Sequence, residues 1–221
     1  MPPSGQLSAV VAALDDHDRD MLASALGRLS SASDVAELAA LVLARMEVGL
    51  LDEWERTELV KLMAETVVDP GEFETDQIEH VLALLRTALR DEDWITRGWA
   101  VQALGVFASE RDLGAIREAA LADPHEWVRA DAVDVLHDLD RERLDDVVAS
   151  LLEDSDVGSY VWWVAGVYAA AAGARVDLPP VGSLLAEDEE LVTRLLSTVR
   201  HLLDSEPKAA LLARSMVSSL R

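Results

Sequence analysis

The sequence contains no cysteine and few basic residues. Without cysteine there can be no disulfide, no thiolate zinc site and no cysteine nucleophile. Only 19 of its 221 residues are Lys or Arg, against 42 Asp and Glu, and the net charge is -23. Because a surface that follows a phosphate backbone needs clustered Lys and Arg, direct binding to DNA or RNA is disfavoured. A basic partner is favoured instead, although a salt-adapted or GC-rich proteome would produce the same acidity.

Long apolar runs are also scarce. The one charge-free stretch of membrane-spanning length, Val157 to Ala174, contains three glycines and falls in register with a helical repeat. Both features favour a buried helix over a membrane span. The N-terminus has no basic region before its short apolar run, which argues against a signal peptide. We therefore expect a soluble, cytoplasmic protein that has no membrane partner.

Motifs that carry catalysis are missing as well. The sequence has no glycine-rich phosphate loop and no recognisable serine-nucleophile motif. The cluster DDHDRD at residues 15–20 places His17 among four aspartates, but a calcium loop from Asp16 would need Gly and Glu where Met21 and Gly27 stand. These carboxylates are expected to cap a helix. We predict no catalytic, cofactor-binding or metal-binding residue, and a protein that is not an enzyme.

What the sequence does contain is a repeat. The segment DEDWITRGWAVQALGVF, which begins at Asp91, aligns with DPHEWVRADAVDVLHDL, which begins 32 residues later at Asp123. The alignment pairs identical residues at Arg97 and Arg129, Ala100 and Ala132, Val101 and Val133, and Leu104 and Leu136. A third, degraded copy has Asp156, Val161, Ala165 and Ala169 in equivalent places and Trp162 in place of the arginine. A period of this length is typical of stacked helical arrays.

Each repeat is expected to contain two helices, because a pair this short buries its apolar stripe only against stacked neighbours. The Asp at the turn should cap the second helix and face the guanidinium of its own or an adjacent repeat. We predict an all-α, right-handed α-solenoid of antiparallel helix pairs with about twelve helices. It is expected to be a single domain over residues 1–221. Divergent repeats occupy 1–75, the clearest repeats 76–174 and C-terminal capping helices 175–221.

These units resemble HEAT repeats of the short bacterial kind, similar to those of the phycobilisome-lyase group. The repeated Asp and Arg and the apolar positions of the second helix carry the resemblance. It implies a curved protein-binding scaffold, a fold that hosts many functions. His125-Glu126 is similar to the His-Glu pairs of the HEAT-repeat metal oxygenases that hydroxylate deoxyhypusine. Those sites need several such pairs, whereas the equivalent residues here are Asp93 and Trp94.

Aromatic residues are few, but six of them are Trp, against two Phe and two Tyr. Trp54, Trp94 and Trp127 lie at helix starts and repeat turns and are expected to pack one unit on the next. Trp99 aligns with Asp131, a polar position that should face solvent. We predict a partner-binding groove on the concave face, formed by Trp99, Gln102, Asp131, Asp134, Trp162 and Trp163. The alternative is that these aromatics fill gaps between units.

Several function classes are compatible with this sequence. The leading one is a non-enzymatic protein–protein interaction module that binds a basic or partly apolar protein or peptide on its concave face. A specific form of it is an acidic immunity or inhibitor protein against a basic toxin or nuclease. The resemblance alone suggests a chromophore-lyase-like enzyme or chaperone, with the aromatics around a tetrapyrrole. A HEAT-like DNA glycosylase would need a basic groove, which the charge opposes. We expect no cofactor.

Overall fold

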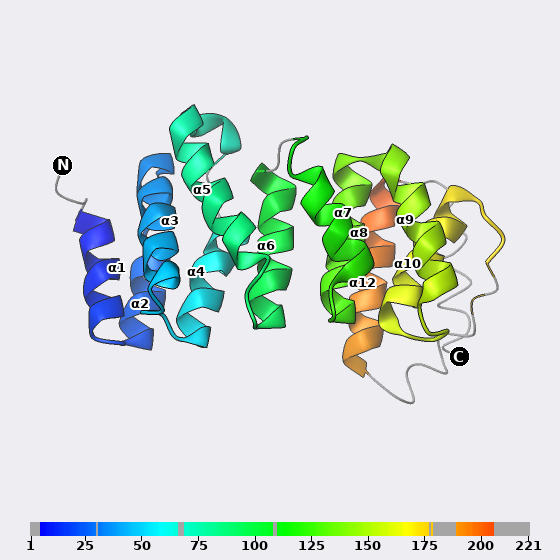
Figure 1. Ribbon diagram of the computed structural model, residues 1–221, viewed down its shortest axis with the longest axis horizontal. Helices are drawn as coiled ribbons and strands as arrows, with labels where there is room; N and C mark the ends of the chain where they lie inside the picture. The colour runs from blue at the N-terminus through cyan, green and yellow to red at the C-terminus, as the bar shows by residue number, and fades with distance from the viewer. Residues whose placement is uncertain are drawn as a thin grey trace. The chain divides into compact units, whose positions relative to one another are not determined.

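The computed structural model describes residues 5–29, 31–65, 69–107, 110–176, 178 and 189–205. These residues form 11 α-helices and one short 3-10 helix, and no strand occurs among them (Figure 1). The prediction of an all-α protein is confirmed for this part of the chain. Of the expected C-terminal capping helices over 175–221, the part from 206 to 221 lies outside the described residues. The chain divides into two compact units, unit 1 (Met1–Ile116) and unit 2 (Arg117–Arg221); the expectation of a single domain stays a prediction.

Unit 1 is a stack of helix pairs. Its helices are α1 (Gly5–Asp15), α2 (Arg19–Leu26), α3 (Ala32–Glu47), α4 (Glu53–Glu65), the 3-10 helix η1 (Pro70–Glu72), α5 (Thr75–Ala88) and α6 (Trp94–Phe107). The first helices of successive pairs lie side by side, as α3 and α5 do, and so do the second helices α4 and α6 (Figure 1). This arrangement is the one that the repeat predicted, because each pair covers the apolar stripe of the next.

Unit 2 repeats this pattern. It contains α8 (Glu126–Leu139), α9 (Arg141–Asp154), α10 (Tyr160–Ala172) and α12 (Glu189–Ser205), while α7 (Leu113–Ala122) includes the boundary between the units. The second helices α8 and α10 pack on each other, and α12 packs on α10 (Figure 1). Helix α12 therefore packs against the second helices of this unit, with side-chain contacts to both α8 and α10.

Short polar side chains begin several helices where the sequence predicted caps. Asp18 Oδ1 accepts the backbone N–H of Met21 at 2.8 Å at the start of α2. Before α4, Asp52 Oδ1 accepts the N–H of Glu55 at 2.8 Å, and Glu55 Oε2 accepts the N–H of Asp52 at 2.9 Å. This reciprocal pair satisfies two backbone donors that the helix itself leaves free. The caps therefore fix the points at which the second helices start.

The apolar positions of the repeat form the core. Val101 and Leu104 in unit 1 and their counterparts Val133 and Leu136 in unit 2 are all 0% exposed. Val161, in the third copy, is also 0% exposed. Burial of a Val or Leu side chain contributes roughly 1.5–3 kcal/mol, so these equivalent positions stabilise each helix pair in the same way.

Helix α10 is buried on nearly every side. The structure buries 11 of its 13 residues, and a helix that is apolar all round is stable only when it is covered all round. Gly166 lets the following chain approach closely, since a Cβ there would lie 2.5 Å from a side-chain carbon of Leu178. Within the charge-free stretch, Tyr160–Ala172 is thus a core helix, as predicted, while Val157 before it is exposed. Within the described residues, the structure has no helix with the length and apolarity that crossing a bilayer requires.

Candidate functional site

An arginine in the second helix ties each repeat to its own turn. Arg97 Nη1 in α6 donates to the carbonyl oxygens of Asp91 and Glu92 at 2.9 and 3.0 Å. Arg129 Nη1 in α8 donates to the carbonyl oxygen of Asp123 at 2.7 Å. Each arginine is the fourth residue of its helix. The repeated arginine therefore fixes the main chain of the turn that leads into the helix.

The repeated carboxylates do not cap the second helices in the way that the sequence predicted: Asp93 caps α6, and α8 begins after His125 without a side-chain cap. Asp91 accepts two hydrogen bonds, at 2.8 and 3.2 Å, from the guanidinium of Arg56 in the preceding second helix α4. Asp123 Oδ1 accepts the backbone N–H of His125 at 2.8 Å. The predicted pairing with an adjacent repeat is confirmed for Asp91. Arg56 is also the fourth residue of its helix and donates to the carbonyl of Leu51 at 3.2 Å, so it is a third member of the arginine series.

Alignment of α4, α6 and α8 on these arginines identifies a stripe of side chains that point away from the core. The positions two residues before the arginine and two, five and nine after it are half-buried or exposed in all three helices. This spacing places them on one helix face. We call them the outer stripe: Trp54, Glu58, Lys61 and Glu65 on α4, Ile95, Trp99, Gln102 and Val106 on α6, and Trp127, Asp131, Asp134 and Asp138 on α8.

Four of the predicted partner-binding residues belong to the outer stripe. Trp99 and Gln102 lie on α6 in unit 1, and Asp131 and Asp134 lie on the equivalent positions of α8 in unit 2. The sequence alignment predicted this equivalence and the solvent-facing side of Trp99. Sequence reasoning missed that Trp54 and Trp127 occupy the first position of the same stripe. Including Arg56 in the arginine series would have found them.

Trp162 and Trp163 lie elsewhere. Their side chains are 7% and 1% exposed, and their rings pack edge to face with centroids 5.8 Å apart. Both belong to the buried helix α10 and to the core of unit 2. This burial agrees with the alternative interpretation that they fill space between helices, and it keeps them off the outer stripe.

Residues 52–137, from the turn before α4 into the last turn of α8, match the family model of HEAT repeats. This segment of the chain consists of HEAT repeats. The match includes the three second helices that carry the arginine series, and it begins upstream of residue 76, where the sequence repeat is clearest. HEAT repeats are generally protein-interaction scaffolds. No curated protein and no solved structure matches the chain.

The tryptophans of the outer stripe share a contact. Each has a basic side chain over its indole ring, within the distance at which a cation is attracted to an aromatic face. The pairs are Arg19 and Trp54 at 4.9 Å, Lys61 and Trp99 at 5.6 Å, and Arg194 and Trp127 at 4.2 Å from the ring centroid. In a chain with so few basic residues, this recurrence shows that the outer stripe of the HEAT repeats accommodates cations.

In unit 2, α12 covers the outer stripe of α8. Asp134 Oδ1 accepts the hydroxyl of Tyr168 in α10 at 2.7 Å, and Asp134 Oδ2 accepts that of Thr198 in α12 at 3.4 Å. Burial and the nearby carboxylate of Asp134 raise the pKa of both Tyr160 and Tyr168, so both phenols stay protonated. Asp134, predicted to ring an open groove, instead joins three helices of the HEAT stack.

In unit 1 the same stripe is open to solvent. Ile95 and Val106 on α6 are 40% and 43% exposed, and Trp99 between them is half-buried. On α4, Lys61 Nζ lies 3.9 Å from Glu58 Oε1 as well as over Trp99. This face therefore combines apolar surface, an amphipathic indole and charges of both signs, which is a composition suited to a protein partner.

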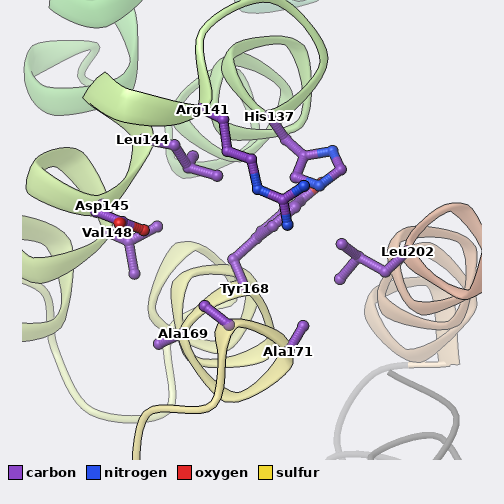
Figure 2. A pocket seen from close by; sticks show the side chains of 10 residues that line it. His137, Arg141, Leu144, Asp145, Val148, Tyr168, Ala169, Ala171 and Leu202 are labelled. Carbon is purple, nitrogen blue, oxygen red and sulfur yellow. The ribbon is translucent and has the colours of Figure 1, made fainter. Parts of the chain in front are cut away.

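Two other candidate sites lack either the space or the side chains that a ligand would need. A cavity of about 20 Å³ lies where His137, Tyr168 and Leu202 meet (Figure 2), which is space for about one water molecule. In the DDHDRD cluster, Asp18 caps α2 and His17 Nδ1 lies 2.8 Å from Glu55 Oε1. Among the residues that the structure describes, no three side chains of metal-binding type come together.

Proposed function

We propose that this protein is a non-enzymatic scaffold that binds another protein through the open outer stripe of unit 1. The site comprises Trp99 and Gln102, both predicted from the sequence, together with Trp54, Ile95 and Val106. The observation that carries the proposal is the recurrent pairing of a stripe tryptophan with a basic side chain. A surface that attracts the chain's own few cations is suited to those of a partner.

The charge of the chain supports a basic partner. At a net charge of -23, the protein attracts positively charged molecules over distances of about 8–10 Å or more at moderate salt. The apolar side chains of the stripe add a contribution that does not depend on salt, because they bury area against the partner. The partner segment is therefore basic and partly apolar, and its capture slows as salt rises. An inhibitor that neutralises a basic toxin would be one case of this function.

Site-specific photo-crosslinking in the native host tests the proposal. A photoreactive amino acid at Gln102 should form a covalent adduct with the partner, and one at Glu118, exposed on the first helix α7, should not. The adduct at Gln102 should disappear when Trp99→Ala is added. With the partner identified, Trp99→Ala should weaken its affinity about thirtyfold, as loss of an aromatic anchor of about 2 kcal/mol requires. Equal affinities for Trp99→Ala, Glu118→Ala and the parent would overturn the proposal.

A further inference from the structure

Helix α12 shows what binds the outer stripe in unit 2. Its side chains Val192, Leu195, Val199 and Leu202 are at most 3% exposed and form one apolar face against the other helices of unit 2. On the same side, the Arg194 guanidinium lies over the ring of Trp127. The occupant of the α8 stripe is therefore an amphipathic helix that places a cation on the first stripe residue.

The contacts of α12 also define its direction. Arg194 meets Trp127 early in α8, and Thr198, one turn later, meets Asp134. Leu202, a further turn along, shares a small cavity with His137 near the end of α8 (Figure 2). Because the order of contacts is the same in both helices, α12 runs parallel to α8.

In the described part of unit 1, no helix lies over the apolar stripe of the equivalent pair, although the Arg19 side chain of α2 lies over Trp54. The second helices α4 and α6 pack together as α8 and α10 do. By alignment on the arginines, Trp54 is the counterpart of Trp127, and Lys61 is the counterpart of Asp134. Beside them, Ile95 and Val106 remain 40% and 43% exposed. The α4–α6 face thus keeps the aromatic position of the unit 2 site and reverses the charge at its third position.

We propose that the α4–α6 face takes one amphipathic α-helix of a partner protein, which lies parallel to α4. This inference rests on the proposed function and specifies the partner. A basic side chain of that helix takes the place of Arg19 over Trp54, as Arg194 lies over Trp127. The residue four positions later is acidic and faces Lys61, where Thr198 faces Asp134. Apolar side chains between them cover Ile95 and Trp99.

A synthetic peptide serves as the probe. It has the sequence of residues 189–205, with Glu189, Glu190 and Asp204 changed to Gln to reduce repulsion from the acidic chain. Thr198→Glu supplies the acid for Lys61 one turn after Arg194. Fluorescence anisotropy of the labelled peptide, titrated with the full-length protein, gives the affinity. A second peptide with Ser197→Pro carries the same charges but cannot form a continuous helix.

We expect the helical peptide to bind at least about tenfold more tightly than the proline peptide. Trp54→Ala in the protein should weaken binding at least about tenfold, whereas Trp127→Ala, at the equivalent position that α12 covers, should leave it unchanged. Lys61→Glu should weaken binding of this peptide and strengthen binding of one with Thr198→Lys. The charge exchange distinguishes direct recognition of Lys61 from a general loss of structure.

Three results would overturn the inference. Equal binding of the helical and proline peptides would reject the helical mode, while a crosslink at Gln102 would still support the proposed function. Weakening by Trp127→Ala but not by Trp54→Ala would mean that the peptide exchanges with α12 on α8. Sedimentation that shows a dimer of the free protein, lost in Trp54→Ala, would assign the face to a second copy of the chain.

Discussion

At the scale of single residues, one guanidinium binds the main chain of the turn before each of the helices α4, α6 and α8. Arg97 is only 8% exposed and binds two carbonyl oxygens. A buried guanidinium is stable only when its donors are satisfied, and the turn carbonyls would otherwise lack donors in the core. The function of the repeated arginine is thus to donate hydrogen bonds to backbone carbonyls. Neither Lys nor an apolar residue can supply these bonds in the same geometry.

We expect Arg97→Ala to lower the free energy of unfolding by about 2–3 kcal/mol, because it removes charge-assisted, partly buried hydrogen bonds to two turn carbonyls. Arg143→Ala is the matched control. Its guanidinium is 49% exposed and pairs with Asp140 one turn away, so its loss should change stability by less than about 1 kcal/mol. Urea unfolding followed by circular dichroism measures both. Equal effects would show that the arginine series has no special structural role.

Asp93 gives the start of α6 a dependence on pH. Burial acts to raise its pKa, but hydrogen bonds from the backbone N–H groups of Thr96 and Ile95 and from the hydroxyls of Thr96 and Thr57 outweigh burial and lower it. A carboxyl whose folded pKa lies below its unfolded value stabilises the fold above that unfolded value. The contribution is lost as the pH falls through the folded pKa.

Asp93→Asn should therefore be less stable than the parent by about 1–2 kcal/mol at neutral pH, where the carboxylate accepts all of these bonds. The difference should shrink below about pH 4, because the parent then protonates Asp93 and loses the same interactions. Urea titrations at about pH 7 and pH 3 test this. A difference that stays constant with pH would assign the effect to side-chain shape instead of charge.

At the scale of secondary-structure elements, α10 depends on α12. The first is buried almost all round, and the second contributes the apolar face and the hydroxyl of Thr198 that meet it and α8. Without α12, the aromatic and aliphatic side of α10 would face water. The C-terminal helix is thus part of the core of unit 2 and also the occupant of its outer stripe.

We expect Leu195→Ala in α12 to destabilise unit 2 by about 2–5 kcal/mol, since it opens a cavity at a site that is 0% exposed. Ser197→Ala, at an exposed position of the same helix, should have little effect and separates packing from helix propensity. Tryptophan fluorescence during urea unfolding reports the change through Trp162 and Trp163. Identical midpoints for the two variants would mean that α12 is only loosely attached.

At the scale of the whole molecule, the charge opposes compaction. With 42 acidic and 19 basic residues, most carboxylates repel one another, and the buried pairs such as Arg56 with Asp91 offset only part of that repulsion. Added salt screens the long-range repulsion far more than it screens a partly buried pair at short range. The sign of the salt effect therefore shows which of the two dominates.

We predict that the unfolding temperature rises when NaCl is increased from about 0.01 to 0.3 M, as the Debye length falls from about 30 to less than 8 Å. The same rise in KCl would identify screening as the cause, independent of the cation. A fall in the unfolding temperature would show instead that attractive ion pairs control the stability of the stack.

The sequence by itself determined the helices of the described residues, their pairing and the repeated core positions. The apolar period of 3.6 residues fixes which face of an amphipathic helix is buried, and the 32-residue repeat then makes those faces meet in successive pairs. It also placed Trp99 and Gln102 on a solvent-facing side, because the second copy carries Asp131 and Asp134 at these positions. All of this information lies within a few turns of the chain.

Only the tertiary structure decided what covers each outward face. Helix α10 has no polar side, so periodicity says nothing about its orientation, and the burial of Trp162 and Trp163 follows from packing on all sides. The contact of α12 with α8 joins residues 64 positions apart, Asp134 and Thr198, and no local pattern predicts such a pairing. The stripe of α8 is therefore covered by α12, whereas Ile95 and Val106 on the stripe of α6 are exposed. Which distant segment covers an apolar face depends on the packing of the whole fold and not on the order of the segments in the sequence.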